Sequence, residues 1–98
     1  MKKEDIQRRW RILESVYAQK IISRAPLQVR QKYEFWKEQI EDDGPMGIRK
    51  WKGFYDHLLK GVWEGYRSSY LNKQYRVIYR IETENRTVFV ERIGPHNY

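Results

Sequence analysis

The sequence predicts an α+β domain in which an N-terminal helix hairpin packs on one face of an antiparallel β-meander. Three observations predict this fold. Apolar side chains recur at helical spacing before residue 44, glycines become frequent after it, and three strand-like segments separated by polar turns follow. The chain of 98 residues is long enough for one core and too short for two, so we expect a single domain over residues 1–98.

The clearest predicted helix covers residues 27–42. Pro26 stands where a helix can begin, and Gly44 is placed to end it. Within this segment the apolar side chains are spaced four, three and four residues apart, which gives one stripe: Val29, Tyr33, Trp36 and Ile40.

The segment before this helix fits two patterns. Its apolar residues fit one long helical stripe, but Trp10–Glu14 also fits a short strand that precedes a helix capped by Ser15 and running to Arg24. Periodicity alone does not choose between them. In both cases two helices meet at Ala25 and Pro26 as an antiparallel hairpin.

Three strands are predicted after residue 60: Trp63–Leu71, Tyr75–Glu82 and Arg86–Ile93. In the second, alternation puts Val77 and Tyr79 on an apolar face that should meet the helices. Closure of the second hairpin about Glu84-Asn85 adds Val88 and Val90 to that face.

The other face of the predicted sheet carries Arg76 and Arg80. Symmetric closure of the first hairpin puts Ser69 opposite Arg76 and brings Arg67 diagonal to Arg76 on this uncovered face. Two neighbouring guanidinium groups repel unless an anion lies between them. Glu91 is expected on the same face and could be that anion in a local ion pair. The alternative is an arginine pair that binds phosphate.

Histidines occur at two positions only, His57 and His96. A lone histidine is most often structural or exposed. Here His57 lies in a glycine-flanked loop before the first strand, and His96 follows the last strand, so both can border the uncovered face. Groups that titrate near neutral pH beside arginines suit acid–base chemistry on a phosphate. Two histidines without a companion carboxylate at ligand spacing do not predict a metal site.

The composition of the chain excludes several classes of site and favours one class of partner. The chain has no cysteine, which excludes disulfides, thiolate zinc sites and cysteine nucleophiles. The absence of cysteine fits a reducing cytoplasm, where we expect the protein, and no uncharged run approaches the roughly 18 residues of a membrane span. The net charge is +7, and residues 44–98 carry ten basic against five acidic side chains. This excess favours a polyanionic partner such as nucleic acid, although small domains are also basic for solubility.

The stretch DHLLKGVWEGYRSSYLNKQYRVIYRIETENRTVFVERIGPHNY resembles the bacterial RelE/ParE toxin superfamily, and most of all its ribosome-dependent mRNA interferases of the RelE and YafQ kind. The shared features are the DH-x-L-x-G loop, the GYR and YRVIYRI strands and the ER-x-G-x-H terminus. The helix stripe also fits. Because that family begins with a short strand, the resemblance favours a strand at Trp10–Glu14.

The resemblance implies a type II toxin: an endoribonuclease that cleaves mRNA in the ribosomal A site, inhibits translation and is neutralised by a cognate antitoxin. No cofactor is expected. Residue by residue, it implies catalytic roles for His57, Arg67, Arg76, His96 and Tyr98. Other basic residues would bind ribosomal RNA: Lys50, Lys52, Lys60, Lys73 and Arg80. The chain departs from the family at Ser69, Tyr70 and Gln74, where relatives carry a lysine, a histidine and an acidic residue.

Two alternatives stay open at this stage. The ParE branch of the superfamily inhibits DNA gyrase and cleaves no RNA. A non-enzymatic RNA-binding module could use Trp63 and Tyr66 as stacking platforms, although these rings also suit core or hairpin packing.

Overall fold

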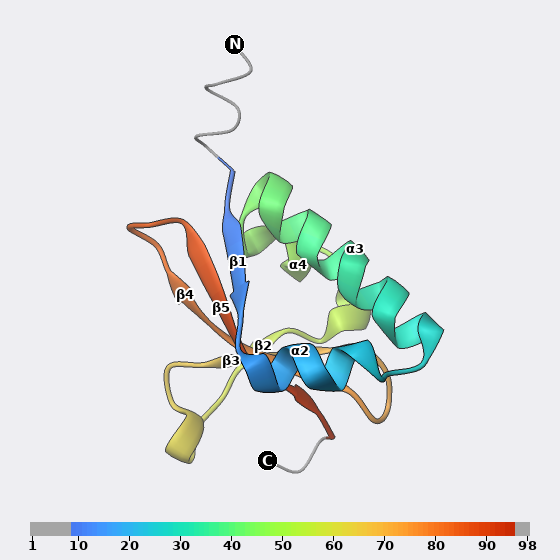
Figure 1. Cartoon of the computed structure of the whole chain (residues 1–98). Helices are drawn as coiled ribbons and strands as arrows, with labels where there is room; N and C mark the ends of the chain where they lie inside the picture. The colour runs from blue at the N-terminus through green and yellow to red at the C-terminus, as the bar shows by residue number, and fades with distance from the viewer. Residues whose placement is uncertain (1–8, 96–98) are drawn as a thin grey trace.

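The computed structural model describes residues 9–95 and contains a five-stranded sheet with helices on one side (Figure 1). In chain order the elements are β1 (Arg11–Glu14), α2 (Val16–Ser23), α3 (Leu27–Asp43), α4 (Met46–Arg49), the 3₁₀ turn η1 (Lys52–Phe54), β2 (His57–Leu58), the 3₁₀ turn η2 (Gly61–Trp63), β3 (Arg67–Tyr70), β4 (Arg76–Glu82) and β5 (Thr87–Gly94). None of the helices in this described range is long and apolar enough to cross a bilayer.

The sheet has the strand order β1-β5-β4-β3-β2. Strands β3 to β5 form the antiparallel meander that the sequence predicts, β2 extends it antiparallel at one edge, and β1 joins the far edge parallel to β5. The α+β class and the helices over one sheet face are therefore confirmed. The sheet is mixed, because β1 pairs parallel with β5 while the other strand pairs are antiparallel.

The N-terminal segment follows the second of the two patterns. A strand, β1, is followed by Ser15, whose Oγ accepts a hydrogen bond from the Ala18 N–H at 3.0 Å and so caps α2. Ser15 Oγ also donates to the Glu91 carbonyl at 2.8 Å, which ties the cap to β5. Helix α3 ends at Gly44, whose φ of 77° suits glycine.

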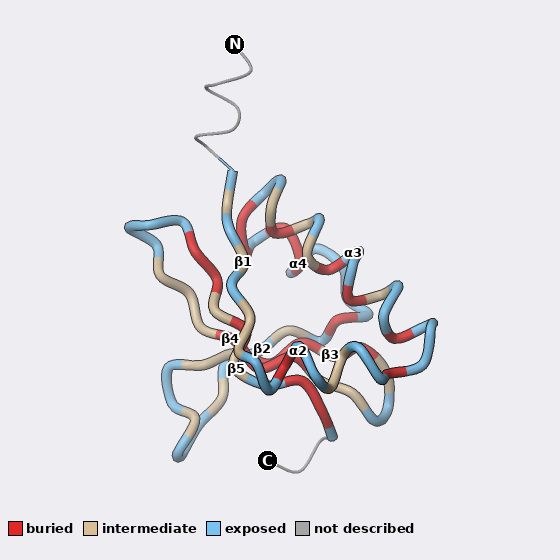
Figure 2. Tube along the Cα trace, viewed as in Figure 1, coloured by how far each residue is buried: buried red, intermediate tan, exposed pale blue. Residues whose placement is uncertain are grey.

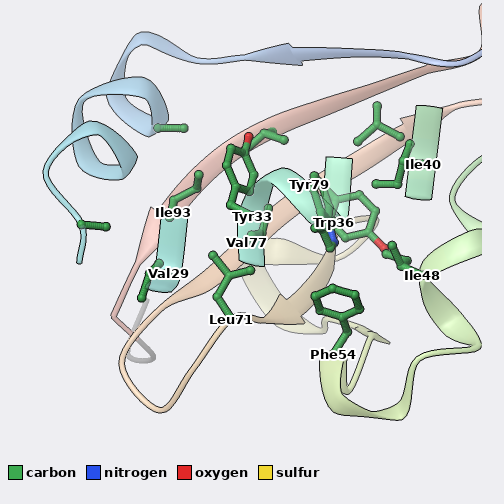
Figure 3. Close-up of a cluster of buried hydrophobic side chains, with 14 residues drawn as sticks. Val29, Tyr33, Trp36, Ile40, Ile48, Phe54, Leu71, Val77, Tyr79 and Ile93 are labelled. Carbon is green, nitrogen blue, oxygen red and sulfur yellow. The ribbon is translucent and has the colours of Figure 1, made fainter. Parts of the chain in front are cut away.

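The core lies between α3 and the sheet (Figure 3). Buried segments concentrate on the sheet and on one side of α3 (Figure 2). The ring centroids of Trp36 and Tyr79 are 5.2 Å apart in an edge-to-face arrangement, and Trp36 Nε1 donates to Ser69 Oγ at 2.9 Å. The four residues of the predicted stripe are all buried, as are the predicted sheet partners Val77, Tyr79, Val88 and Val90.

The first predicted strand, Trp63–Leu71, is shorter than expected. Strand β3 holds only Arg67–Tyr70, and η2 occupies the preceding segment. Gly61 and Gly65 have φ of 72° and 94°, which a β-strand does not allow, so the segment between them, which carries Trp63, forms a turn. The two-residue edge strand β2, which contains His57, was not predicted.

The register of the first hairpin differs by one residue from the prediction. Tyr70, not Ser69, lies opposite Arg76, and Arg67 lies opposite Tyr79. Because side chains alternate between faces, this single step moves Arg67 to the face that the helices cover. The prediction that Arg67 and Arg76 share the uncovered face is therefore wrong.

The loop of this hairpin explains the difference. The N–H of Leu71 donates to the Tyr75 carbonyl at 2.9 Å, so the connection spans residues 71–75 and is not a two-residue turn. The Asn72 side chain stabilises it by accepting from the N–H groups of Gln74 and Tyr75 at 2.7 and 2.8 Å. In the second hairpin, by contrast, Glu82 pairs with Thr87 as predicted.

The face opposite the helices is partly covered as well. Its central residues Ser68 and Ile78 are 0% and 1% exposed. The loop between β2 and β3 carries Trp63, whose ring centroid lies 5.7 Å from the guanidinium carbon of Arg92 on β5. To reach β5, this loop has to cross β3 and β4. Glu91 lies at a bulge in β5 and lines a groove with Trp63 and Arg92, so it is not placed between Arg67 and Arg76.

Candidate functional site

Arg67 belongs to a buried charged cluster on the helix-covered side of the sheet, which we call the Asp56 cluster. The Asp56 side chain is only 1% exposed. Its Oδ2 accepts from Arg67 Nε at 2.8 Å and lies 3.7 Å from Arg49 Nε. Its Oδ1 accepts from Ser69 Oγ at 2.8 Å and from Tyr79 OH at 2.5 Å. Both carboxylate oxygens are thus fully used inside the protein.

The cluster shifts the pKa values of its members. Burial alone would lower the pKa of Arg67, but the hydrogen bond and negative charge of Asp56 more than offset this, and the pKa is raised. Burial raises the pKa of Tyr79 far above its ordinary value, and the charge of Asp56 raises it further. Arg67 is therefore ion-paired with Asp56, and its guanidinium group does not face the predicted phosphate site.

His57 stands on the face opposite the helices. It lies in β2 across from Ser68, while the neighbouring Asp56 points to the helix side. The His57 ring is exposed, and its Nδ1 lies 2.8 Å from the Tyr55 carbonyl oxygen. A carbonyl oxygen can only accept, so Nδ1 holds the proton. In the neutral ring this leaves the lone pair on Nε2, which can accept a proton.

Arg76 opens β4 on the same face as His57. Three residues on neighbouring strands lie side by side on this face: His57, Ser68 and Ile78. Arg76 lies two residues before Ile78 on β4, so its side chain is on the same face. With strands about 4.8 Å apart, the Cα atoms of His57 and Arg76 are separated by roughly 12 Å. The Arg76 guanidinium carbon lies 4.8 Å from the centroid of the Tyr70 ring.

Lys32 of α3 is a second cation beside the Tyr70 ring. Its Nζ lies 5.6 Å from the Tyr70 ring centroid and 5.4 Å from that of Phe54. The cation that accompanies Arg76 beside Tyr70 is therefore Lys32, from a helix, and not Arg67 from the neighbouring strand. This residue was missed because no spacing rule links α3 to the edge of β3.

The residues predicted to bind ribosomal RNA come from several segments of the chain, from the end of α4 to β4. Lys50 forms an ion pair with Asp43 at 3.1 Å, at the C-terminal end of α3. Lys73 lies beside Ile21 and Pro95 in a groove of about 580 Å³. Lys52 and Lys60 are exposed, and the Arg80 guanidinium carbon lies 4.1 Å from the Phe89 ring centroid. Their role in RNA binding stays a prediction.

The remaining predicted catalytic residues, His96 and Tyr98, lie outside the described range. The last described strand brings Gly94 opposite Arg76, two positions before His96 in the sequence. Among residues 9–95, no group of three or more histidine, aspartate and glutamate side chains is arranged to hold a metal ion.

Two further residues of this region were missed by the sequence analysis. Asp56 was noted only as the first letter of the DH motif, and its buried partners come from three separate segments. Tyr55 has a φ of 45° and an exposed ring, and both are consequences of the turn that η1 makes. A bulky residue in the left-handed region is uncommon and is a signal that only the backbone reveals.

No protein-family model and no curated protein sequence matches the chain. Solved structures do match. A chain of the RelE–RelB complex from the archaeon Pyrococcus horikoshii aligns with a TM-score of 0.71 at 18% identity, over 90% of this chain and 96% of that one. This is the RelE-like toxin fold. A chain of the Staphylococcus aureus YoeB–YefM complex gives a TM-score of 0.68 at 17% identity, over 92% and 99% of the two chains.

A chain of the Escherichia coli DinJ–YafQ toxin–antitoxin complex shares the RelE-like fold as well, with a TM-score of 0.64 at 22% identity over 90% of this chain and 93% of that chain. The resemblance on which the sequence analysis relied is therefore confirmed at the level of the fold. The same core of paired helices on a mixed sheet extends over nearly the whole of both chains. Fold alone does not assign a reaction, which has to be argued from the site.

Proposed function

We propose that the protein is the toxin of a type II toxin–antitoxin system and that it is an endoribonuclease which cleaves mRNA on the ribosome. The toxin assignment is supported by the RelE-like fold, which the structures of three toxin–antitoxin complexes share. The ribonuclease assignment is supported chiefly by His57, whose Nδ1–H is engaged by the Tyr55 carbonyl on the sheet face that also carries Arg76.

The proposed reaction needs no metal. The ribose 2′-oxygen attacks the adjacent phosphorus as the bond from phosphorus to the 5′-oxygen breaks. The products are a 2′,3′-cyclic phosphate and a 5′-hydroxyl. In this proposal His57 Nε2 takes the 2′ proton, and Arg76 binds the phosphate oxygens on which negative charge develops. His96 or Tyr98 returns a proton to the leaving 5′-oxygen.

Arg67 has a different role in this proposal from the one the family resemblance implied. It neutralises Asp56, the residue directly before His57, and so fixes the start of β2. We therefore assign it as a positioning residue. The loss of Arg67 from the predicted arginine pair is an observation that favours the second candidate, a ParE-like gyrase inhibitor, which needs no acid–base set.

The test is single-turnover cleavage of mRNA on saturated ribosomes, read by primer extension. His57→Ala and Arg76→Ala should each slow cleavage by about 100-fold or more, because losing a proton-transfer partner or a transition-state cation has effects of that size. The 3′ ends of the products should be cyclic phosphates. Circular dichroism of each variant confirms that the fold is kept.

Lys20→Ala is the matched control, since this exposed lysine lies on α2, away from β2 and β4. It should cleave at the wild-type rate. Unchanged cleavage by both His57→Ala and Arg76→Ala would contradict the proposed site. Absence of cleavage by the wild type, together with inhibition of gyrase supercoiling, would replace the proposal with the second candidate.

A further inference from the structure

A run of aromatic rings and cations borders the site along the edge formed by β3 and η1. The Tyr55 and Tyr70 ring centroids are 5.4 Å apart, with the rings nearly perpendicular at 88°. Lys32 and Arg76 both lie over the Tyr70 ring. Tyr55 is 67% exposed, whereas Tyr70 is half-buried. The outer ring is thus presented to solvent, and the inner ring supports it.

The backbone of Tyr55 is unusual as well. Its φ of 45° and ψ of 44° are left-handed, a conformation that is unfavourable for a bulky side chain. This conformation accompanies two contacts at once: the carbonyl accepts from His57 Nδ1, and the ring meets Tyr70 edge-on. Unfavourable backbone conformations concentrate at functional sites.

The charge of this edge is one-sided. Lys32 makes no ion pair with any other residue between 9 and 95, and its ammonium group lies only against aromatic rings. Asp56, which directly follows Tyr55, points to the helix-covered side of the sheet and is already bound by Arg67. An occupant of this surface therefore has to combine a flat apolar group with negative charge. An unpaired nucleotide has both, and stacked bases on tyrosine beside basic side chains are a general mode of binding single strands.

We propose that Tyr55, supported by Tyr70, is a stacking platform for one unpaired RNA base next to the scissile bond, and that Lys32 binds the phosphate of that nucleotide. The inference rests on the proposed ribonuclease function, because it places the base beside His57 and Arg76. It adds a binding subsite that the catalytic residues do not require. An acidic protein segment is the other class of occupant that the charge would allow.

The experiment measures binding separately from cleavage. The probe is a fluorescein-labelled single-stranded hexamer of 2′-O-methyl RNA, which has no free 2′-hydroxyl to attack, and the readout is fluorescence anisotropy with the purified full chain. Tyr55→Gly removes the ring and retains a residue that favours the left-handed backbone. It should weaken binding by about fivefold or more, the range seen when one stacked base is lost. Tyr55→Phe should bind like the wild type.

Lys32→Gln should weaken binding and reduce the slope of log affinity against log salt concentration by about 1, since one phosphate contact is lost. Lys20→Gln and Tyr17→Ala are matched controls on α2 and should leave affinity and slope unchanged. A hexamer with abasic positions should bind the wild type and Tyr55→Gly equally, because no base remains to stack.

Equal hexamer affinity for the wild type and Tyr55→Gly would overturn the inference. So would a Tyr55→Gly defect confined to binding of an acidic peptide such as oligoglutamate. The two proposals can fail separately. Weaker hexamer binding by Tyr55→Gly, with no mRNA cleavage by the wild type, would support the stacking subsite and contradict the ribonuclease function. Normal mRNA cleavage by the wild type, with no effect of Tyr55→Gly on hexamer binding, would support the ribonuclease function and contradict the subsite.

Discussion

At the scale of single residues, neighbours decide what an arginine does. Arg67 and Arg76 lie on adjacent strands, and each starts its strand. Arg67 faces the helices, where its side chain is 15% exposed and bound to a buried carboxylate. Arg76 faces the other way, against an aromatic ring beside solvent. One residue of register thus separates an arginine bound to a buried carboxylate from an arginine on the opposite face of the sheet.

The Asp56 cluster should be important for stability. Asp56→Ala would leave the largely buried Arg67 without its partner, and breaking a buried pair in this way costs about 3–5 kcal/mol. We expect the free energy of unfolding in urea to fall by that amount. Asp43→Ala breaks the exposed pair with Lys50 and is the control, with an expected change below about 1 kcal/mol. A similar small change for Asp56→Ala would contradict the structural role of the cluster.

At the scale of elements, two buried tyrosines join segments distant in sequence. Tyr33 OH of α3 donates to Glu14 Oε2 of β1 at 2.5 Å, and Tyr79 OH of β4 donates to Asp56 before β2. Burial raises the pKa of Tyr33 well above its ordinary value, and the bond to Glu14 adds to this. The pKa of Tyr79 is raised for the corresponding reasons. Both contacts require the protonated phenol as donor.

This arrangement predicts an alkaline loss of stability. In the unfolded chain both tyrosines ionise near pH 10, whereas in the folded chain they stay protonated, so the folded state binds more protons above that pH. The stabilisation is complete below pH 10 and decreases above it by about 1.4 kcal/mol per pH unit for each tyrosine. Urea unfolding between pH 9 and 11.5 measures this slope.

Tyr33→Phe and Tyr79→Phe should each reduce the dependence of the unfolding free energy on alkaline pH by the contribution of one tyrosine, about 1.4 kcal/mol per pH unit. The exposed Tyr17 serves as the control, because Tyr17→Phe should leave the slope unchanged. A slope that is the same in all three variants and the wild type would show that these phenols do not govern the alkaline transition.

At the scale of the whole molecule, the net charge of +7 results from 20 basic against 13 acidic side chains. Lys60 and Lys73 are exposed and lie on separate loops. Basic residues placed in this way can strengthen association with a large polyanion without taking part in the reaction. The same charge suits an acidic antitoxin segment, which the proposed function requires as a partner.

Substitution of these lysines should therefore change ribosome binding without changing the rate of mRNA cleavage. Lys60→Ala and Lys73→Ala should each weaken ribosome binding and lower its salt dependence, as expected when a phosphate contact is removed. Cleavage on saturated ribosomes should stay near the wild-type rate in both. Co-sedimentation at several salt concentrations measures the first, and single-turnover primer extension measures the second. Slower cleavage at saturation would place these lysines in the reaction itself.

Local patterns in the sequence determined most of the fold. The stripe on α3 and the alternation in β4 are set by burial of one face, so periodicity alone locates the core residues Trp36 and Val77. Choosing the short strand before Ser15 also needed the family resemblance, because both patterns satisfied the same spacing. The class, the helical layer and the second hairpin followed from these signals.

Only the tertiary structure decided the make-up of the candidate site. The loop 71–75 set the register, and this turned Arg67 toward Asp56 and brought Tyr70 opposite Arg76. Lys32 reaches the same ring from a helix more than thirty positions earlier. A local sequence pattern does not predict such contacts, because the length of a loop and the packing of α3 on the sheet depend on the free energy of the whole chain. The left-handed Tyr55, which positions the imidazole of His57, is a product of that same packing.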